Sequence, residues 1–150
     1  MDKAFRALRK DLAQIALEWE SKFGIAPAIT SAISEYDAAT LLGYSEEEYS
    51  KNMNGRTAVS KGHDIIVKGK KYQIKANRPS GKKGSKVTLV APAKNFEWDK
   101  LVWILYNEKY VMQEAWEFDK ETYKKLFFVD GKVKRISPYD MRKGKRIYPV

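Results

Sequence analysis

One short pattern constrains the fold more than any other: two strand-like segments joined by two residues. Residues 64–67 (Asp-Ile-Ile-Val) and 70–75 (Lys-Lys-Tyr-Gln-Ile-Lys) contain several β-branched and aromatic side chains, and Lys68-Gly69 separates them. A two-residue connection that contains glycine is typical of a tight hairpin turn. The sequence therefore predicts a β-hairpin here, and with it a sheet.

The hairpin is expected to bring three polar side chains together. The turn places Asp64 opposite Gln73, and a turn centred one residue later places it opposite Lys75. Opposed residues have Cβ atoms about 4.5–5.5 Å apart. Because side chains alternate along a strand, Gln73 and Lys75 share one face while Tyr72 and Ile74 take the other. Asp64, Gln73 and Lys75 therefore converge in either register.

Helical periodicity dominates the N-terminal part of the chain. Large apolar residues recur there every three or four positions, namely Phe5, Leu8, Leu12, Ile15, Trp19 and Phe23. This spacing predicts a helix with one apolar face, which ends at Gly24. We expect that face to pack on the chain's own sheet, and the alternative is that it pairs two subunits.

The remaining elements predict a mixed α/β domain. Expected after the first helix are a helix over about 28–42, a short helix from Ser45, strands at 87–90, 101–106 and 110–116, and a helix capped by Asp119. The apolar run 101–106 is continuous, which indicates a central strand covered on both faces. We expect one domain over residues 1–150 with a central mixed sheet flanked by helices. Its parts are N-terminal helices at 2–50, a sheet core at 56–128 and a basic tail at 132–150.

Charge is concentrated in two segments. The chain has 29 Lys and Arg against 19 Asp and Glu, for a net charge of +10. Residues 51–86 carry eleven basic and one acidic side chain, and residues 132–150 carry seven and one. Such blocks attract polyanions by releasing their counterions, which favours a nucleic acid as the partner. The alternative is a solubilising surface with no specific partner.

Two absences narrow the class of protein. There is no cysteine, which excludes disulfides, a Cys-based zinc site and a thiol nucleophile, and fits a reducing cytoplasm. The N-terminus has no apolar signal core, and no apolar run approaches the roughly 20 residues that span a bilayer. We therefore expect a soluble cytoplasmic protein with no membrane partner.

The polar cluster of the hairpin has the composition of a metal site. A carboxylate and an amide oxygen are ligands that Mg²⁺ accepts while it keeps several of its waters. A bound metal activates water and stabilises charge on a phosphate, and a nearby ammonium can do the latter as well. Taken alone, the same pattern is also compatible with a solvent-facing strand that has no chemistry.

Residues 63–75 resemble the motif of the restriction endonuclease-like, or PD-(D/E)XK, nuclease superfamily. Asp64 falls on the first acid of the motif, and Gln73-Ile74-Lys75 falls on its (D/E)-X-K triplet. Upstream, Ser34-Glu35-Tyr36 is similar to the helix that often brings a further acid to the metal in this family. Downstream, residues 96–106 look like the next sheet strand of small type II restriction enzymes. The resemblance covers roughly residues 28–128.

This chain departs from the family pattern at two positions: His63 replaces the proline of the motif, and Gln73 replaces its second acid. The resemblance still implies a restriction endonuclease-like fold and a Mg²⁺-dependent deoxyribonuclease, with Mn²⁺ as a substitute. It implies that Asp64, Gln73, Glu35 and the Ile74 carbonyl hold the metal, and that Lys75 serves the attacking water. The alternative is a non-catalytic nucleic-acid-binding module that keeps the fold.

The implied partner is double-stranded DNA, and the implied setting is the inside of a prokaryotic or phage-infected cell. A homodimer is a further expected partner, since a palindromic cut by one small domain normally requires two-fold symmetry. The residues expected to contact DNA, mainly at phosphates, are Lys70, Asn77, Arg78, Lys82, Lys83 and Lys86. Among them, Asn77 or Arg78 could read base edges through paired hydrogen bonds. We expect Trp98, Trp103 and Trp116 in the core rather than stacked on bases.

Overall fold

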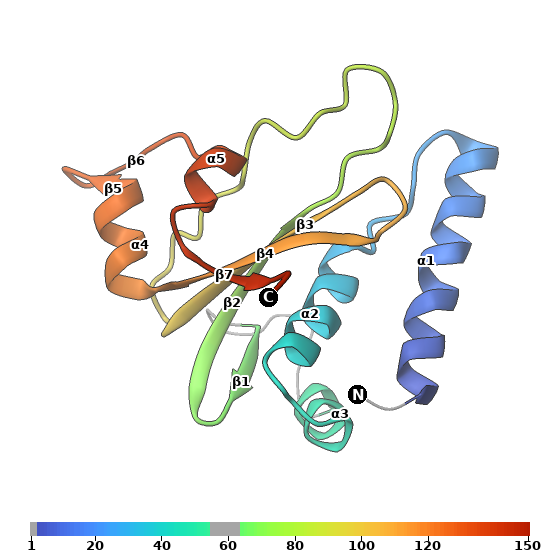
Figure 1. Ribbon diagram of the computed structural model, residues 1–150, viewed down its shortest axis with the longest axis horizontal. Coiled ribbons are helices and arrows are strands. Elements are labelled where there is room, and N and C mark those ends of the chain that lie inside the picture. Colours follow the sequence, from blue (N-terminus) through green and yellow to red (C-terminus); the bar gives the residue numbers. More distant parts are fainter. Residues whose placement is uncertain (1–2, 55–63) are drawn as a thin grey trace.

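A computed structural model describes residues 3–54 and 64–150 of the chain (Figure 1). The elements of this part are, in order, α1 (Lys3–Phe23), α2 (Thr30–Leu41), α3 (Glu46–Asn54), β1 (Ile65–Val67), β2 (Lys70–Asn77), β3 (Lys100–Tyr106), β4 (Met112–Asp119), α4 (Lys120–Phe127), β5 (Phe128–Val129), β6 (Lys132–Val133), α5 (Pro138–Met141) and β7 (Lys145–Tyr148). The fold is mixed α/β, as the sequence predicts.

A five-stranded mixed sheet forms the centre of the fold, with the strand order β1-β2-β3-β4-β7. β2 and β3 are parallel, whereas the other neighbouring pairs are antiparallel. β5 and β6 form a separate small ribbon. The central position of β3 confirms the prediction for residues 101–106, which are almost all buried.

The hairpin has the predicted turn and register. Val67 pairs with Lys70, so the connection is Lys68-Gly69. Both connecting residues have positive φ, 50° for Lys68 and 78° for Gly69. Glycine tolerates this left-handed conformation, and a turn of this kind matches the twist of the two strands.

Two hydrophobic clusters lie on opposite faces of the sheet. On β3, Val102 and Ile104 belong to a cluster with α1, α2 and the hairpin. Leu101 and Trp103 belong to the other cluster, with α4, α5 and the segment before β3. Figure 1 shows the same division, with α1, α2 and α3 at one end of the molecule and α4 and α5 at the other. Trp98 and Trp103 are fully buried, which confirms their predicted core position.

The predicted strand at 87–90 is wrong. The connection between β2 and β3, residues 78–99, contains no strand or helix. It is fixed by single bonds instead, including Val90 N–H to the Ile136 carbonyl at 3.0 Å. Because this long connection crosses over, β3 runs parallel to β2 rather than continuing a meander.

The predicted packing of the first helix is also wrong. α1 buries Ala13 and Ala16 and packs Leu17 against the same cluster, whereas most of the large apolar side chains of the predicted face are exposed, namely Leu8, Leu12, Ile15, Trp19 and Phe23. The periodicity identified the apolar face correctly, but that face does not lie on the sheet. Within the described residues, no helix combines the length and the apolar character that a membrane span requires.

The C-terminal segment is part of the fold rather than a tail. β7 adds the fifth strand to the sheet beside β4. Before it, Ser137 caps α5: its Oγ accepts from the Asp140 N–H at 3.3 Å, and the Asp140 carboxylate accepts from the Ser137 N–H at 2.9 Å. Ile136 and Met141 are buried in the second cluster. The predicted cap of α4 is confirmed, because the Asp119 carboxylate accepts from the Thr122 N–H at 2.8 Å.

Candidate functional site

A cavity of about 370 Å³ lies at the edge of β2, beyond the point where β1 pairs with it. It is lined by Thr30, Ser31, Ser34, Glu35, Asp64, Gln73, Ile74, Lys75, Ala76 and Ala91. The residues that the sequence predicted for a metal site thus line one cavity. Three segments build it: the first turns of α2, the hairpin and the end of the β2–β3 connection.

Asp64 extends the hairpin by one residue, through one backbone and one side-chain hydrogen bond to β2. Its N–H donates to the Tyr72 carbonyl at 2.8 Å, as a strand residue does. Its carboxylate Oδ2 then accepts the Ile74 N–H at 2.7 Å. The N–H and C=O of one strand residue point to the same side. The Ile74 carbonyl is therefore directed to the edge where the Asp64 carboxylate lies.

β2 alternates as predicted. Tyr72 and Ile74 are buried in the cluster beneath α2. Gln73 and Lys75 lie on the opposite face, are half-buried, and line the cavity. The burial of their neighbours fixes the direction of these two side chains, since a change of register by one residue would put them in the core.

α2 brings Glu35 to the same cavity. The helix is held against β2 by Ile33, Ala38 and Ala39, which are almost completely buried. Glu35 follows the buried Ser34, whose hydroxyl donates to the Ser31 carbonyl at 3.0 Å. Glu35 is half-buried and lines the cavity beside the first turn of α2. The sequence pointed to Glu35 through the resemblance alone, and helix periodicity gave no reason to place it beside Asp64.

The donor set suits a small hard cation. Asp64 and Glu35 offer carboxylates, Gln73 offers an amide oxygen, and the Ile74 carbonyl is directed to the same edge. Mg²⁺ prefers oxygen ligands and retains waters, so it does not need a complete protein cage. In residues 3–54 and 64–150, no group of three or more His, Cys, Asp or Glu side chains could hold a metal. A cation here would depend on neutral oxygens as well as on two acids.

Sequence reasoning missed the small polar residues of the cavity wall, Thr30, Ser31 and Ser34. They occupy the start of α2, where the first amide groups of a helix carry a partial positive charge. The available signal was their position before Glu35 on one predicted helix.

The structure corrects the expected roles of Asn77 and Arg78. The Asn77 amide oxygen accepts from Trp103 Nε1 at 2.9 Å, and its nitrogen donates to the Leu89 carbonyl at 3.1 Å. Arg78 makes a two-bond ion pair with Glu20, at 2.8 and 2.9 Å. Its guanidinium also lies 4.4 Å from the centroid of the Tyr110 ring. Both side chains are used inside the fold, so neither is available to read base edges.

The lysines expected to grip phosphate differ among themselves. Lys82 donates to the Gly24 carbonyl at the end of α1. Lys70, Lys83 and Lys86 are exposed. Lys70 lies at the turn of the hairpin, whereas Lys83 and Lys86 lie on the β2–β3 connection. The last two therefore keep the role that the sequence suggested for the loop, as candidates for phosphate contacts.

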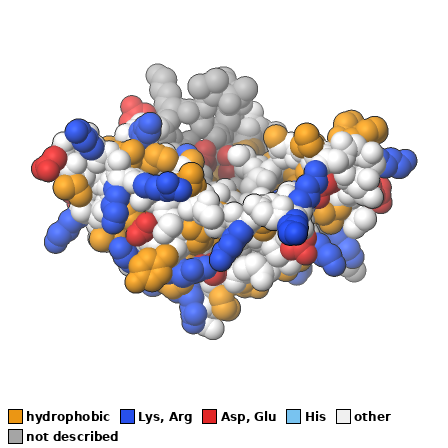
Figure 2. All heavy atoms as spheres, turned by 90° about the horizontal axis from the view of Figure 1, so that it is seen from above, with side chains coloured by type: hydrophobic (Ala, Val, Ile, Leu, Met, Phe, Trp, Pro, Cys, Tyr) orange, Lys and Arg blue, Asp and Glu red, His pale blue; other side chains and the backbone are white. Residues whose placement is uncertain are grey.

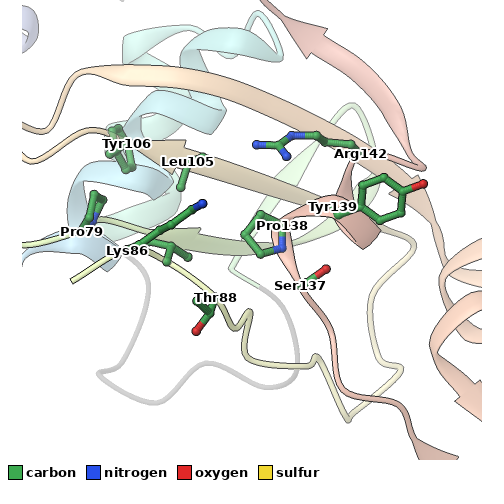
Figure 3. Close-up of a pocket in the computed structure, with 10 residues that line it drawn as sticks. Pro79, Lys86, Thr88, Leu105, Tyr106, Ser137, Pro138, Tyr139 and Arg142 are labelled. Atoms are coloured by element: carbon green, nitrogen blue, oxygen red, sulfur yellow. The ribbon is translucent and has the colours of Figure 1, made fainter. Parts of the chain in front are cut away.

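A second cavity, of about 470 Å³, lies on the other side of this connection. It is bounded by the connection, the end of β3 and α5. Lys86 and Arg142 extend into it from different elements (Figure 3), while Pro79, Leu105 and Pro138 supply apolar walls. The Arg142 guanidinium is paired with Glu114, at 2.7 and 3.2 Å. The connection thus borders both cavities, through Ala91 in the first and Lys86 in the second.

Basic side chains are spread over one face of the molecule. Figure 2 shows Lys and Arg side chains across this face, interrupted by single acidic and apolar groups. A surface of this kind attracts a polyanion at many points rather than at one. His63, the residue that replaces the motif proline, lies outside the described residues, as do all of residues 56–63 at the start of the expected sheet core.

No protein-family model matches the chain, and no curated protein matches its sequence. The features of the chain that bear on its function are therefore the cavity at the edge of β2 and the charged residues around it.

Proposed function

We propose that this protein is a metal-dependent endonuclease that hydrolyses phosphodiester bonds in double-stranded DNA. The observation that carries the proposal is the convergence of Asp64, Glu35, Gln73 and Lys75 on one cavity at the edge of β2. Two acids, an amide and an ammonium in one place are the groups that metal-assisted phosphodiester hydrolysis uses.

The order of the elements supports a restriction endonuclease-like fold. A helix that carries an acid, a hairpin that carries the Asp and the Gln-X-Lys triplet, and a buried central strand follow one another in the chain. This is the order that the resemblance implies. β1 pairs with β2 only as far as Tyr72, so among the described residues no strand pairs with the far half of β2 on that side, and the cavity opens there.

Asp64, Glu35, Gln73 and the Ile74 carbonyl would hold the metal, which we propose to be Mg²⁺ with Mn²⁺ as a substitute. When bound, the metal would polarise the scissile phosphate and make a bound water a better nucleophile. The Ile74 N–H holds the Asp64 carboxylate at 2.7 Å, so this ligand is oriented before any metal arrives. Such orientation lowers the entropic cost of assembling the site.

Lys75 would orient the attacking water and stabilise the negative charge that develops on the phosphate. Its ammonium belongs to the same cavity as Asp64 and lies on the same face of β2 as Gln73. A fixed positive charge at the point where negative charge develops is one of the strongest contributions to catalysis.

DNA would lie over the β2–β3 connection. This connection borders the site cavity and carries the exposed Lys83 and Lys86. Lysine contacts to phosphates position a duplex without reading its sequence. The basic C-terminal segment would offer further contacts: Arg142 lines the second cavity together with Lys86, and both are exposed.

The test is incubation of the protein with supercoiled plasmid and Mg²⁺ or Mn²⁺. We expect nicked or linear DNA, and no cleavage when the metal is chelated. Asp64→Asn should abolish cleavage while binding to DNA in Ca²⁺ remains. Lys71→Ala is the matched control, because Lys71 lies on the same strand but is exposed near the hairpin turn. Wild-type cleavage by Asp64→Asn would remove the proposed site.

One observation favours a second function. Gln73 stands where the family motif has an acid, and a neutral ligand holds a metal less strongly than a carboxylate does. A chain that binds DNA tightly but does not cleave it with either metal is a binding module that keeps the fold. The same experiment separates the two functions, since binding and cleavage are measured on one DNA.

A further inference from the structure

The surface of α1 is divided in an unusual way. Its large apolar side chains are exposed, with exposed fractions from 37% for Leu12 to 66% for Phe23; they are Leu8, Leu12, Ile15, Trp19 and Phe23. We call these five residues the α1 stripe. Ile25, directly after the helix, is 76% exposed. An exposed apolar row of this length is unusual on a soluble surface and marks an interaction site.

An adjacent side of α1 already anchors the helix to the fold. Arg9 makes two bonds to the Asp37 carboxylate, at 2.8 and 2.9 Å, and one to the Tyr110 carbonyl at 2.8 Å. Three turns later, Glu20 makes the ion pair with Arg78. Between these anchors α1 packs through Ala13, Ala16 and the partly buried Leu17. The helix is thus fixed without the α1 stripe, whose side chains are exposed.

We propose that the α1 stripe pairs with the α1 stripe of a second copy of this chain. The stripe residues follow one another at spacings of four, three, four and four. Spacings of three and four are those by which two helices interlock side by side, and a second α1 has the matching pattern. A two-fold axis would bring the same surface of both copies together, which is the commonest form of self-association.

The exposed area agrees with this partner. A fully exposed aromatic side chain offers on the order of 150–250 Å². From their exposed fractions, the stripe and Ile25 offer on the order of 600 Å² in each copy. Two copies would bury about 1,200 Å², the lower end of the range for specific interfaces.

An apolar groove continues the stripe on the side of α2. It has a volume of about 180 Å³ and is lined largely by apolar and aromatic side chains, including Leu8, Leu12, Ile33 and Tyr36. A groove beside the stripe can receive a large side chain from the facing helix, as packed helices do. The charges that border the stripe on its other side are Asp11, Glu18 and Lys22. They have both signs, so no single-sign field opposes the approach of a second copy.

The inference does not depend on nuclease activity, because the stripe lies on α1 and the candidate site lies at β2. The experiment measures the molar mass of the full chain by sedimentation over a range of concentrations. We expect a species of twice 17.3 kDa. Ile15→Lys combined with Trp19→Lys should give a folded monomer, because two charges would face their copies across the axis.

Val129→Lys is the matched control. Val129 is 56% exposed against 58% for Ile15, but it lies on β5 at the other end of the fold. We expect this variant to remain a dimer. A wild-type chain that stays monomeric up to roughly 100 μM would overturn the proposal, since interfaces of this size reach micromolar affinity or better. The wild-type chain would be monomeric in this way if the α1 stripe binds another protein or a lipid surface instead of a second copy. Dimerisation of the double variant would overturn it as well.

A single cysteine gives a second measurement, because the natural chain has none. Ile15 lies at the middle of the stripe, so its Cβ lies near the two-fold axis whether the helices run parallel or antiparallel. Ile15→Cys should form a disulfide-linked dimer on mild oxidation, because two-fold related Cα atoms within about 7 Å can be bridged. Val129→Cys, equally exposed, should link much more slowly. Equal rates would contradict pairing through α1.

Discussion

The end of β2, taken together with Arg78 directly after it, has two halves that use the same kinds of residue in opposite ways. Gln73 and Lys75 direct an amide and a cation into a cavity, beside Asp64. Asn77 and Arg78 also provide an amide and a cation, but Trp103, Leu89 and Glu20 bind their polar atoms within the fold. In this part of the chain, residue type alone therefore does not distinguish a side chain that serves the site from one that stabilises the fold.

The difference comes from what each half faces. The first half lies beyond the last pair of β1 and β2, at an edge where no strand of residues 3–54 or 64–150 pairs with it. The second half meets the β2–β3 connection and the C-terminal end of α1, which bring Leu89 and Glu20 to it from distant parts of the sequence. Substitutions in the first half should therefore change chemistry, and substitutions in the second half should change stability.

The largest expected effects come from Lys75 and Arg78, the cation of each half. Lys75→Ala should lower cleavage by at least about 100-fold, because it removes the charge that stabilises the transition state, and should leave the melting temperature nearly unchanged. Arg78→Ala should lower the free energy of unfolding by about 3 kcal/mol, since it leaves Glu20 without its partner at a site where the Arg78 side chain is 6% exposed. Plasmid cleavage and urea denaturation measure the two effects on each variant. The comparison between the halves fails if Lys75→Ala destabilises the fold as Arg78→Ala is expected to do. It fails as well if Arg78→Ala lowers cleavage without changing stability.

Arg142→Ala is the control for the arginine. Arg142 makes a similar two-bond pair with Glu114, but its side chain is 44% exposed, so its loss should cost less than about 1 kcal/mol.

The pH dependence of the free energy of unfolding gives a further check on the pair of Arg78 and Glu20. The Arg78 guanidinium holds the pKa of Glu20 below its ordinary value of 4.5. The pair therefore stabilises the fold above that pH and loses this contribution as the pH falls through the lowered pKa. The gap between wild type and Arg78→Ala should shrink in acid.

Asn77→Ala should have the next largest effect, on stability alone. It would leave the Trp103 Nε1–H and the Leu89 carbonyl without the partners that the structure shows. An unpaired buried donor costs about 1–3 kcal/mol. Denaturant unfolding measures the loss, and Asn95→Ala is the control, because Asn95 is exposed and its side chain accepts only a long 3.4 Å bond from Glu97. A stable Asn77→Ala variant with weakened DNA recognition would return Asn77 to the role that the sequence suggested.

Gln73→Glu should have a smaller effect, on the metal requirement. An added carboxylate strengthens the attraction to a divalent cation. We expect cleavage to be retained or raised by up to about tenfold, a change of about 1.4 kcal/mol in the barrier, with less Mg²⁺ needed for half-maximal rate. Gln73→Ala should shift the metal requirement in the opposite direction. Loss of cleavage in a folded Gln73→Glu variant that still binds metal would show that Gln73 is not simply a ligand.

Local interactions were predictable from the sequence, and long-range ones were not. The hairpin follows from a two-residue turn and strand alternation, so Asp64, Gln73 and Lys75 were placed correctly relative to one another. The cap at Asp119 depends on a residue three positions away, and it was also correct. The face of α1 and the ion pair of Arg78 depend on which distant surface meets them. Periodicity cannot give that information: the sequence placed the apolar face of α1 on the sheet and assigned Arg78 to DNA, whereas in the structure that face is exposed and Arg78 pairs with Glu20.

The smallest expected effect concerns the lysines of the β2–β3 connection, which lie next to both halves of the strand. Lys83→Ala with Lys86→Ala should weaken binding to all duplexes about equally, because phosphate contacts carry no base information. Each phosphate contact contributes about −0.9 to the slope of log affinity against log salt, so the slope should flatten by up to roughly two units. Lys10→Ala with Lys125→Ala removes the same charge from exposed positions on α1 and α4 and should leave the slope unchanged. A salt titration of the three proteins on one duplex decides the matter. An unchanged slope in the first variant would place the duplex elsewhere, and the basic C-terminal segment around Arg142 and Lys143 would be the surface to test next.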